Sequence, residues 1–469
     1  MTQLDTFAPA LAHRLRILEG ASNLPSPLVE QFGGWLSSAA DEDLFRASPL
    51  QYAELHHIDR GLAVDLFLHA THAGILEFNW GVLCPICGAY ITTEEGLRSL
   101  GKTRFCALCR VDVEPLMDAN IEITFGVSPT IRPLQYHDLN AISTPMDFFH
   151  VYFSPSRVFP PGFADMMAHL LIGFATCPGG DSEMHMTVRE GGHTLLAPMR
   201  HLSIDLQVSP DGTDTPSVSF LHGQAVPQHL HVAPGPITLR IHNGAHLPVL
   251  VMAIRHPDEL PPLSLREYLG APELVTNQTF RDLFRTHSLP APGGLQFKGL
   301  AFLFTDLKGS TEMYDRIGDF RAYDLVREHF SLLYQIVAEH RGAIVKTIGD
   351  AIMATFQDPA AALRAAVAMH GQIGGIGHDG DLGLKIGLHS GPSIAVESNE
   401  HLDYFGQTVN IAARVQGLAS AAEIYCTDAV YQAPQVQSII DQAALAVQRE
   451  EAQLKGVGNA VTVYRLSHP

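Results

Sequence analysis

The chain has 469 residues, of which 46% are hydrophobic and 17% charged, and its formal net charge is −19 at pH 7. This composition is typical of a globular protein of about two to four domains, and the negative charge disfavours a general binder of nucleic acids or anionic membranes. The most apolar stretch, residues 166–176, is too short to cross a bilayer, and the first residues lack the layout of a signal peptide. We therefore expect a cytoplasmic protein without a transmembrane segment.

Residues 1–75 are expected to form a helical unit, because apolar residues recur at three- and four-residue spacing over 9–19 and 49–73. An extended segment follows at 75–80. Helices followed by an extended pair can form a winged-helix unit, which binds DNA or another protein. A small helical packing module is the favoured interpretation.

Two Cys-x-x-Cys pairs come next, Cys84 with Cys87 and Cys106 with Cys109. Each pair can supply two thiolates from one tight turn, and four thiolates complete a tetrahedral Zn²⁺ site with no open position. Such pairs in a cytoplasmic chain favour metal binding over disulfides. We therefore expect a structural zinc ribbon over 76–118, with a redox dithiol or an iron–sulfur centre as the weaker alternatives.

Residues 119–257 carry short alternating apolar runs separated by Gly, Pro and Asp, which predicts a β-rich sandwich or small barrel. His229 and His231 can share one strand face. We interpret them as solvated, because no carboxylate or cysteine completes a ligand set. The Pro- and Gly-rich residues 258–296 are expected to be a linker that couples the two halves of the chain.

Residues 297–469 alternate strands and helices, which predicts an α/β fold arranged as an α+β sandwich. The expected elements are a strand at 300–304, a helix at 311–340, two strands within 344–356, a helix at 359–372, a strand at 384–389, a helix at 408–418 and strands at 423–427 and 461–466.

Two carboxylates in this region follow expected strands. Asp306 ends the first strand, and Asp350 lies in the tight turn of the hairpin. Gly309, Ser310 and Thr311 then start a helix, so that backbone N–H groups face the space beside Asp306. Carboxylates beside a helix N-terminus can hold hard cations against phosphate oxygens. The pattern therefore predicts a site for phosphate chemistry.

The segments that carry these residues resemble the class III adenylyl and guanylyl cyclases. They are Phe304-Thr305-Asp306 with Gly309-Ser310-Thr311, Lys346-Thr347-Ile348-Gly349-Asp350, and the stretch from Asp403 to Arg414 that contains Phe405-Gly406 and Asn410. The resemblance covers the last third of the chain and implies a palm-type, ferredoxin-like catalytic domain. It also implies that a nucleoside triphosphate is cyclised to a 3′,5′-cyclic monophosphate with release of pyrophosphate.

The resemblance assigns roles to individual residues. Asp306, Asp350 and the Leu307 carbonyl would hold two Mg²⁺ or Mn²⁺ ions. Lys346 and Asp403 would recognise the base, and their donor and acceptor pattern suits adenine, so the implied substrate is ATP. Asn410 and Arg414, one helical turn apart, would place the ribose and stabilise charge on the α-phosphate. Lys455, with Gly309, Ser310 and Thr311, would contact the phosphates.

In this family one catalytic domain supplies the metal carboxylates, and a second supplies the set that corresponds to Lys346, Asp403, Asn410 and Arg414. The resemblance therefore implies a homodimer. Two departures stand out: residues 393–401 lack the usual glycine-rich run, and Phe405 replaces a frequent Trp. The N-terminal region is also similar to bacterial regulatory regions with a zinc-ribbon element, which implies an unidentified small-molecule or protein regulator.

Two hypotheses follow. The first is a metal-dependent, homodimeric adenylate cyclase regulated by its N-terminal half. The second is a zinc-ribbon or winged-helix interaction protein that uses an inactive cyclase domain for dimerisation. The complete set of site residues favours the first, and the acidic charge disfavours DNA binding by the second.

Overall fold

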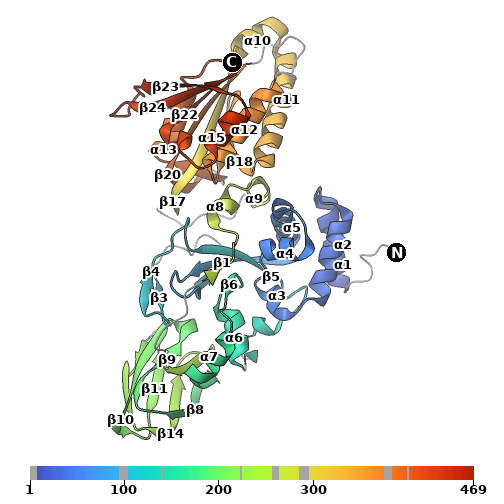
Figure 1. Cartoon of the computed structure of the whole chain (residues 1–469). Helices are drawn as coiled ribbons and strands as arrows, with labels where there is room; N and C mark the ends of the chain where they lie inside the picture. The colour runs from blue at the N-terminus through green and yellow to red at the C-terminus, as the bar shows by residue number, and fades with distance from the viewer. Residues whose placement is uncertain are drawn as a thin grey trace. The chain divides into compact units, whose positions relative to one another are not determined.

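The computed structural model describes residues 8–94, 104–138, 141–142, 144–221, 224–255, 264–284, 295–373, 383–398 and 401–468. The chain forms two compact units (Figure 1). The first contains Met1–Pro115 and Asn120–Leu269, and the second contains Leu116–Ala119 and Gly270–Pro469. Each unit is described by itself.

Seven helices lie in the described part of the first unit: α1 (Pro9–Ala21), α2 (Ser26–Ser38), α3 (Asp41–Phe45), α4 (Pro49–His56), α5 (Arg60–His72), α6 (Pro145–Tyr152) and α7 (Phe163–Leu170). The single helix expected over 49–73 is wrong, because α4 and α5 are separate. His57 adopts a left-handed conformation with φ 53° and ends α4, and the Asp59 side chain caps α5 by accepting from the Leu62 N–H at 3.0 Å.

The strands of the first unit are β1 (Leu76–Leu83), β2 (Tyr90–Glu94), β3 (Arg104–Cys106), β4 (Val111–Val113), β5 (Ile121–Val127), β6 (Arg157–Val158), β7 (Leu171–Cys177), β8 (Gly180–Val188), β9 (Gly191–Ala197), β10 (Leu202–Thr213), β11 (Ser217–Leu221), β12 (Gln224–Val226), β13 (His229–Val232), β14 (Gly235–Asn243), β15 (Val249–Arg255) and β16 (Ser264–Leu265). The sheet β2-β1-β5 packs with the first helices through aromatic side chains, among them Phe32, Phe67 and Phe125.

Two further sheets form the expected β-rich region. One has the order β13-β10-β9-β15-β7 and the other β12-β11-β14-β8. Residues of both sheets alternate in burial along the strands and share one apolar core, which includes Leu206, Val218 and Val251. The region is therefore a β-sandwich, as the alternating apolar runs predicted.

The second unit is built on one eight-stranded sheet with the order β18-β19-β17-β20-β22-β24-β23, to which β21 is added beside β20. The strands are β17 (Leu295–Lys308), β18 (Gly342–Ile348), β19 (Ala351–Phe356), β20 (Gly383–Ser398), β21 (His401–Phe405), β22 (Glu423–Thr427), β23 (Ala446–Ala452) and β24 (Val461–Ser467). The helices are α8 (Ala271–Val275), α9 (Gln278–Leu283), α10 (Ser310–Ile317), α11 (Asp319–Glu339), α12 (Pro359–Ile373), α13 (Gln407–Gln416), α14 (Asp428–Tyr431) and α15 (Val436–Gln442).

Helices cover both faces of this sheet. Ile424 and Cys426 of β22 join the core that α11, α12 and α15 form with one face. Tyr425 between them joins a second core with Val415 of α13, as the two-residue periodicity of a strand requires. The fold is the expected α+β sandwich.

Three details differ from the sequence expectations. Gly318, with φ 79°, separates α10 from α11 inside the single helix expected at 311–340. β20 extends to Ser398 and pairs with β21 where an irregular loop was expected. β23 was not predicted, because its residues, AVQREEA, are exposed or half-buried and lack an apolar face.

None of the helices in the described part of the chain is both long and apolar enough to cross a membrane.

Candidate active site

The two candidate metal carboxylates lie close together, Asp306 in β17 and Asp350 in the turn that directly precedes β19. β17 pairs with β19 antiparallel, and Phe304 lies opposite Met353. Continuing this register by two residues places Asp306 opposite Ala351, which directly follows Asp350. The Thr305 hydroxyl also accepts from the Ile352 N–H at 3.1 Å, which fixes the end of β17 against the start of β19. The structure thus brings Asp306 beside the Gly349–Asp350 turn, where Gly349 adopts φ 65°.

The donor set fits a divalent cation. Asp350 Oδ2 is buried and has no hydrogen-bond partner among the residues that the structure describes. A buried carboxylate oxygen without a partner is costly, and carboxylate and carbonyl oxygens are the ligands that Mg²⁺ and Mn²⁺ prefer. Leu307, whose carbonyl is the further candidate ligand, is a buried residue.

Lys385 is a site residue that the sequence expectations missed. It lies directly opposite Asp306 in the β17–β20 pair, and its Nζ is 2.9 Å from Asp306 Oδ2. The ammonium group therefore adds positive charge beside the carboxylates. In the sequence it is simply a polar residue at the start of an expected strand, so no motif singled it out.

The chain turns sharply after Asp306. Gly309 adopts φ 76°, a left-handed conformation that suits glycine, and α10 begins at Ser310. The backbone of Ser310 and Thr311 therefore forms a helix N-terminus, as predicted, where N–H groups are free of intrahelical partners.

His329 of α11 lies close to Asp350. Burial lowers the pKa of His329 to about 4, although the nearby Asp350 carboxylate opposes this shift. The imidazole is therefore neutral near pH 7 and does not compete with a cation for Asp350.

The two candidate base-recognition residues lie side by side. Lys346 Nζ donates to Asp403 Oδ2 at 2.6 Å, joining β18 to β21. The Asp403 Oδ1 atom accepts from the Tyr404 N–H at 2.8 Å, which orients the carboxylate. Because an ammonium has three donors and a carboxylate about four acceptor positions, both groups keep hydrogen-bonding capacity for a base.

The segment before the catalytic sheet supports this pair. Residues 271–283, inside the expected linker, form α8 and α9. The Arg281 guanidinium of α9 donates to the Leu402 carbonyl and lies 5.7 Å from the centroid of the Tyr404 ring. Burial lowers the pKa of Arg281 and raises that of Tyr404 to about 12. Both neighbours of Asp403 are thus held by one buried side chain.

The same segment also reaches the strand that carries Lys346. The Ile344 N–H of β18 donates to Gln278 Oε1 at 2.7 Å. Tyr404 in turn donates from its hydroxyl to the Val275 carbonyl at 3.3 Å. The α8–α9 segment therefore contacts the strands of both base-recognition residues. Nothing in the sequence singles out Arg281 or Gln278, because both are isolated polar residues in the short helix α9 and belong to no motif.

Asn410 and Arg414 lie on α13, four residues apart. Asn410 is exposed and Arg414 is half-buried. The Arg414 guanidinium lies over Gly456, where an added Cβ would be 3.4 Å from Nη2, so that Arg414 is close to the turn that carries the exposed Lys455. Among the described residues, no hydrogen bond or ion pair joins Asn410 or Arg414 to Asp306 or Asp350.

The four cysteines of the N-terminal unit converge. The sulfur atoms of Cys84, Cys87, Cys106 and Cys109 all lie within 4.8 Å of one another, and those of Cys87 and Cys106 are 3.8 Å apart. A tetrahedral zinc centre with Zn–S bonds of about 2.3 Å places sulfurs roughly 3.8 Å apart. The cluster fits Zn²⁺.

His229 and His231 of the β-sandwich are exposed, as interpreted, whereas His193 is buried. His229 lies 3.2 Å from Asp205, which also pairs with Arg110, and His242 lies 2.7 Å from Asp181. In the described part of the chain, the cysteine cluster is the one group of three or more side chains arranged to hold a metal.

Two family models match the chain. The family of unknown function DUF5939 matches residues 13–282, and the adenylate and guanylate cyclase catalytic domain matches residues 295–468. Adenylate cyclase 2 of Rhizobium meliloti (strain 1021) is 34% identical over 131 residues, which cover 25% of this chain and 36% of the relative. The adenylate cyclase of Anabaena cylindrica is 26% identical over 192 residues, which cover 37% of this chain and 38% of the relative.

The chain thus spans little more than a third of the length of these relatives. The solved structure of the adenylyl cyclase CyaB from P. aeruginosa aligns over 38% of this chain and 97% of that chain, with 21% identity and a TM-score of 0.34. The chain belongs to the DUF5939 family of unknown function through residues 13–282, and residues 295–468 are its adenylate and guanylate cyclase catalytic domain.

Proposed function

We propose that the protein is an adenylate cyclase that converts ATP to 3′,5′-cyclic AMP and pyrophosphate at a homodimer interface, under the control of its N-terminal region. The observation that carries the choice of ATP is the contact between Lys346 Nζ and Asp403 Oδ2 at 2.6 Å. It supports a single recognition site made of one donor and one acceptor.

The edge of adenine matches these two groups. Its N1 atom accepts a hydrogen bond, which Lys346 can donate, and its N6 amino group donates one, which Asp403 can accept. Guanine reverses this pattern at N1 and O6, so the same pair would leave the Lys346 donor and the buried Asp403 acceptor without matching groups on the base. Asp403 is the more buried of the two, which raises the cost of a mismatch.

The reaction joins the ribose 3′-oxygen to the α-phosphorus and breaks the bond from that phosphorus to the pyrophosphate oxygen. Divalent cations held by Asp306, Asp350 and the Leu307 carbonyl would supply charge neutralisation and a lowered pKa for the 3′-hydroxyl. The proton of that hydroxyl leaves to solvent, so a dedicated side-chain base is not needed.

The remaining polar groups bind and orient the triphosphate. The backbone N–H groups after Gly309, where α10 starts, favour phosphate oxygens. Lys385, beside Asp306, and the exposed Lys455 add positive charge that favours binding of the triphosphate. Asn410 places the ribose, and Arg414 stabilises negative charge on the α-phosphate in the transition state.

A homodimer is supported by apolar side chains around these residues. Ile348, between Lys346 and Asp350, is 50% exposed, and Phe405, two residues after Asp403, is 54% exposed. Exposed apolar side chains beside a polar site are suited to contact with another chain. Asn410 and Arg414 of each protomer would then complete the site that holds the carboxylates of its partner.

We further propose that the cysteine cluster holds a structural Zn²⁺. Four thiolates leave no open coordination position. This ion would therefore stabilise the two Cys-x-x-Cys turns, called the cysteine knuckles below, and take no part in the cyclase reaction.

The test is incubation of the full chain with Mn²⁺ and either ATP or GTP, with products separated by chromatography. We expect cyclic AMP and pyrophosphate from ATP, and loss of activity by at least about a hundredfold in Asp306→Ala. Asp441→Ala, at an exposed carboxylate of α15, is the matched control and should retain activity. Absence of product from the wild type, or full activity in Asp306→Ala, would refute the proposal in favour of a scaffold role.

A further inference from the structure

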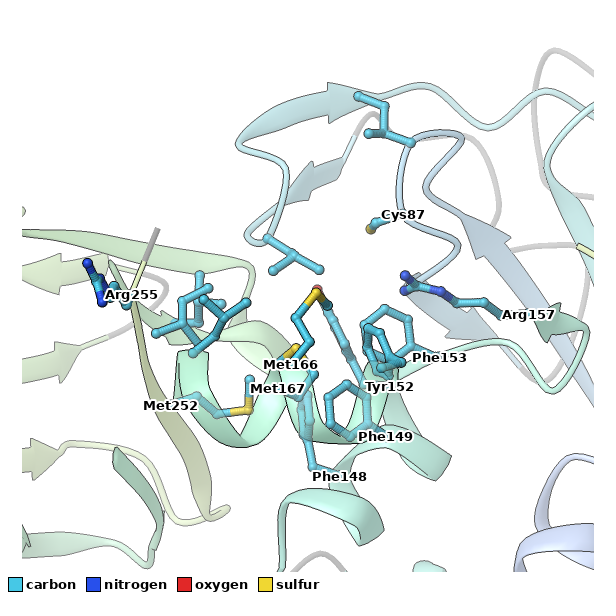
Figure 2. A pocket seen from close by; sticks show the side chains of 16 residues that line it. Cys87, Phe148, Phe149, Tyr152, Phe153, Arg157, Met166, Met167, Met252 and Arg255 are labelled. Atoms are coloured by element: carbon cyan, nitrogen blue, oxygen red, sulfur yellow. The ribbon is translucent and has the colours of Figure 1, made fainter. Parts of the chain in front are cut away.

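The first unit contains a cavity of about 230 Å³ that no part of the cyclase reaction uses. It lies where the cysteine knuckles, helices α6 and α7 and strand β15 meet (Figure 2). Phe149 of α6, Phe153 directly after this helix, Met166 and Met167 of α7 and Met252 of β15 point into it. The cavity belongs to the region matched by the family of unknown function.

The side chains of α7 form an apolar wall of the cavity. Phe163, Met166, Met167 and Leu170 are all apolar and half-buried, and all four line the cavity. Methionine side chains adapt to the shape of what they contact, so this wall suits a small apolar ligand.

Arg157 supplies a polar end. Its Nε and Nη1 atoms are buried and have no hydrogen-bond partner in the part of the chain that the structure describes. The guanidinium lies 4.3 Å from the ring centroid of Phe153 and 4.7 Å from that of Phe159. Contact with the aromatic rings attracts the cation, but it leaves N–H groups unsatisfied, which is costly inside a protein.

The cysteine cluster does not supply a hydrogen-bond acceptor for the Nε and Nη1 atoms of Arg157. The negative charge of Cys87, Cys109 and Cys84 raises the pKa of Arg157 against the larger, opposite effect of burial. These sulfurs thus act on Arg157 at a distance, and none accepts a hydrogen bond from its buried Nε or Nη1. A carboxylate can satisfy two such N–H groups at once, because the guanidinium fork matches its two oxygens.

We propose that this cavity binds a small amphipathic monocarboxylate, with its carboxylate on Arg157 and its apolar body among the phenylalanine and methionine side chains. A cavity of about 150 Å³ holds benzene, so this one suits a ligand of about ten non-hydrogen atoms. Medium-chain fatty acids and aryl alkanoates are in this class. Arg255, at the other end of the cavity, is exposed, so water can satisfy its N–H groups.

The test is calorimetric titration of the full, zinc-loaded chain with octanoate, octan-1-ol and acetate. Octanoate should bind with one site per chain, octan-1-ol at least about tenfold more weakly because it lacks the charge, and acetate not measurably. Equal binding of octanoate and octan-1-ol, or no binding of octanoate, would overturn the proposal without recourse to any variant.

Two matched variants locate the carboxylate. Arg157→Gln should weaken octanoate binding at least about tenfold and leave octan-1-ol binding unchanged, whereas Arg255→Gln should leave both unchanged. Zinc content and the melting temperature establish that each variant is folded. A folded Arg157→Gln that binds octanoate like the wild type would contradict the assignment, as would loss of binding in Arg255→Gln alone.

Discussion

Lys346 is the residue whose charge would decide between the two purine bases. Lys346→Glu removes the donor to adenine N1 and places a second carboxylate beside Asp403, whose Oδ2 is now 2.6 Å from the ammonium. We expect the kcat/KM for ATP to fall at least about tenfold, because hydrogen bonds to charged groups contribute about 1.5–3 kcal/mol. Steady-state kinetics with ATP measure this.

The matched control is Arg449→Glu, which makes the same charge change on an exposed side chain of β23. This strand lies at the opposite edge of the sheet from β18. Unchanged ATP kinetics in Lys346→Glu would show that Lys346 does not contact the base.

The sequence alone identified those candidate site residues that belong to a recognisable local motif. Asp306 and Asp350 follow strand patterns, and the structure places Asp306 in β17 and Asp350 in the turn before the adjacent strand β19. Lys346 and Asp403 are 57 residues apart, and it was the resemblance, rather than spacing, that paired them. Lys385 and Arg281 could not be predicted, because the contact of Lys385 depends on strand register and that of Arg281 on how helix α9 packs against β21.

At the scale of elements, α8 and α9 hold the base-recognition strands in place. Arg281→Met keeps the apolar stem but removes the donor to the Leu402 carbonyl and the charge beside Tyr404. We expect Asp403 to lose its fixed orientation, which should raise the KM for ATP about fivefold or more and lower the preference for ATP over GTP. A smaller change in kcat is expected, because Arg281 does not touch the phosphates in this scheme.

The preference for ATP over GTP separates this role from a purely structural one. A variant that is only less stable would melt earlier and keep the same preference. Arg321→Met, at an exposed position of α11, is the control for the substitution itself. An unchanged ratio of the two kcat/KM values in folded Arg281→Met would argue against the positioning role.

The cysteine knuckles form a second element with a direct test. Cys106→Ala removes one of four sulfurs, and the remaining three bind Zn²⁺ far more weakly. We expect zinc content, measured by elemental analysis, to fall from one ion per chain to nearly none, with a lower melting temperature. Cys177→Ala, at a buried cysteine of the β-sandwich, should keep its zinc. Full zinc content in Cys106→Ala would contradict the four-thiolate site.

Element boundaries show why sequence patterns are incomplete. The apolar spacing over 311–340 continues across Gly318, and only its φ of 79° reveals that two helices meet there. β23 was missed because exposed side chains dominate it, and its pairing with β24 supplies the backbone hydrogen bonds that keep it extended. Tertiary pairing, rather than local preference, determines both features.

At the scale of the whole molecule, one catalytic domain does not bring all the candidate site residues into contact. Asp306 and Asp350 lie together, as do Lys346 and Asp403, but Asn410 and Arg414 make no hydrogen bond or ion pair with Asp306 or Asp350 among the described residues. A twofold dimer would bring the two groups together. Each of its two equivalent sites would then contain the carboxylates of one protomer and Asn410 and Arg414 of the other. The exposed Ile348 and Phe405 would lie in that interface.

Subunit mixing tests the shared site. Asp306→Ala lacks a metal ligand and Arg414→Ala lacks the side chain that stabilises the α-phosphate, so each homodimer should be inactive. Equal mixing gives half heterodimers, in which one site carries both defects and the other none, so activity should return to about a quarter of the wild-type value. Sites formed within single chains would stay inactive in any mixture. Therefore no recovery of activity, in variants shown by native mass spectrometry to exchange subunits, would exclude the shared site.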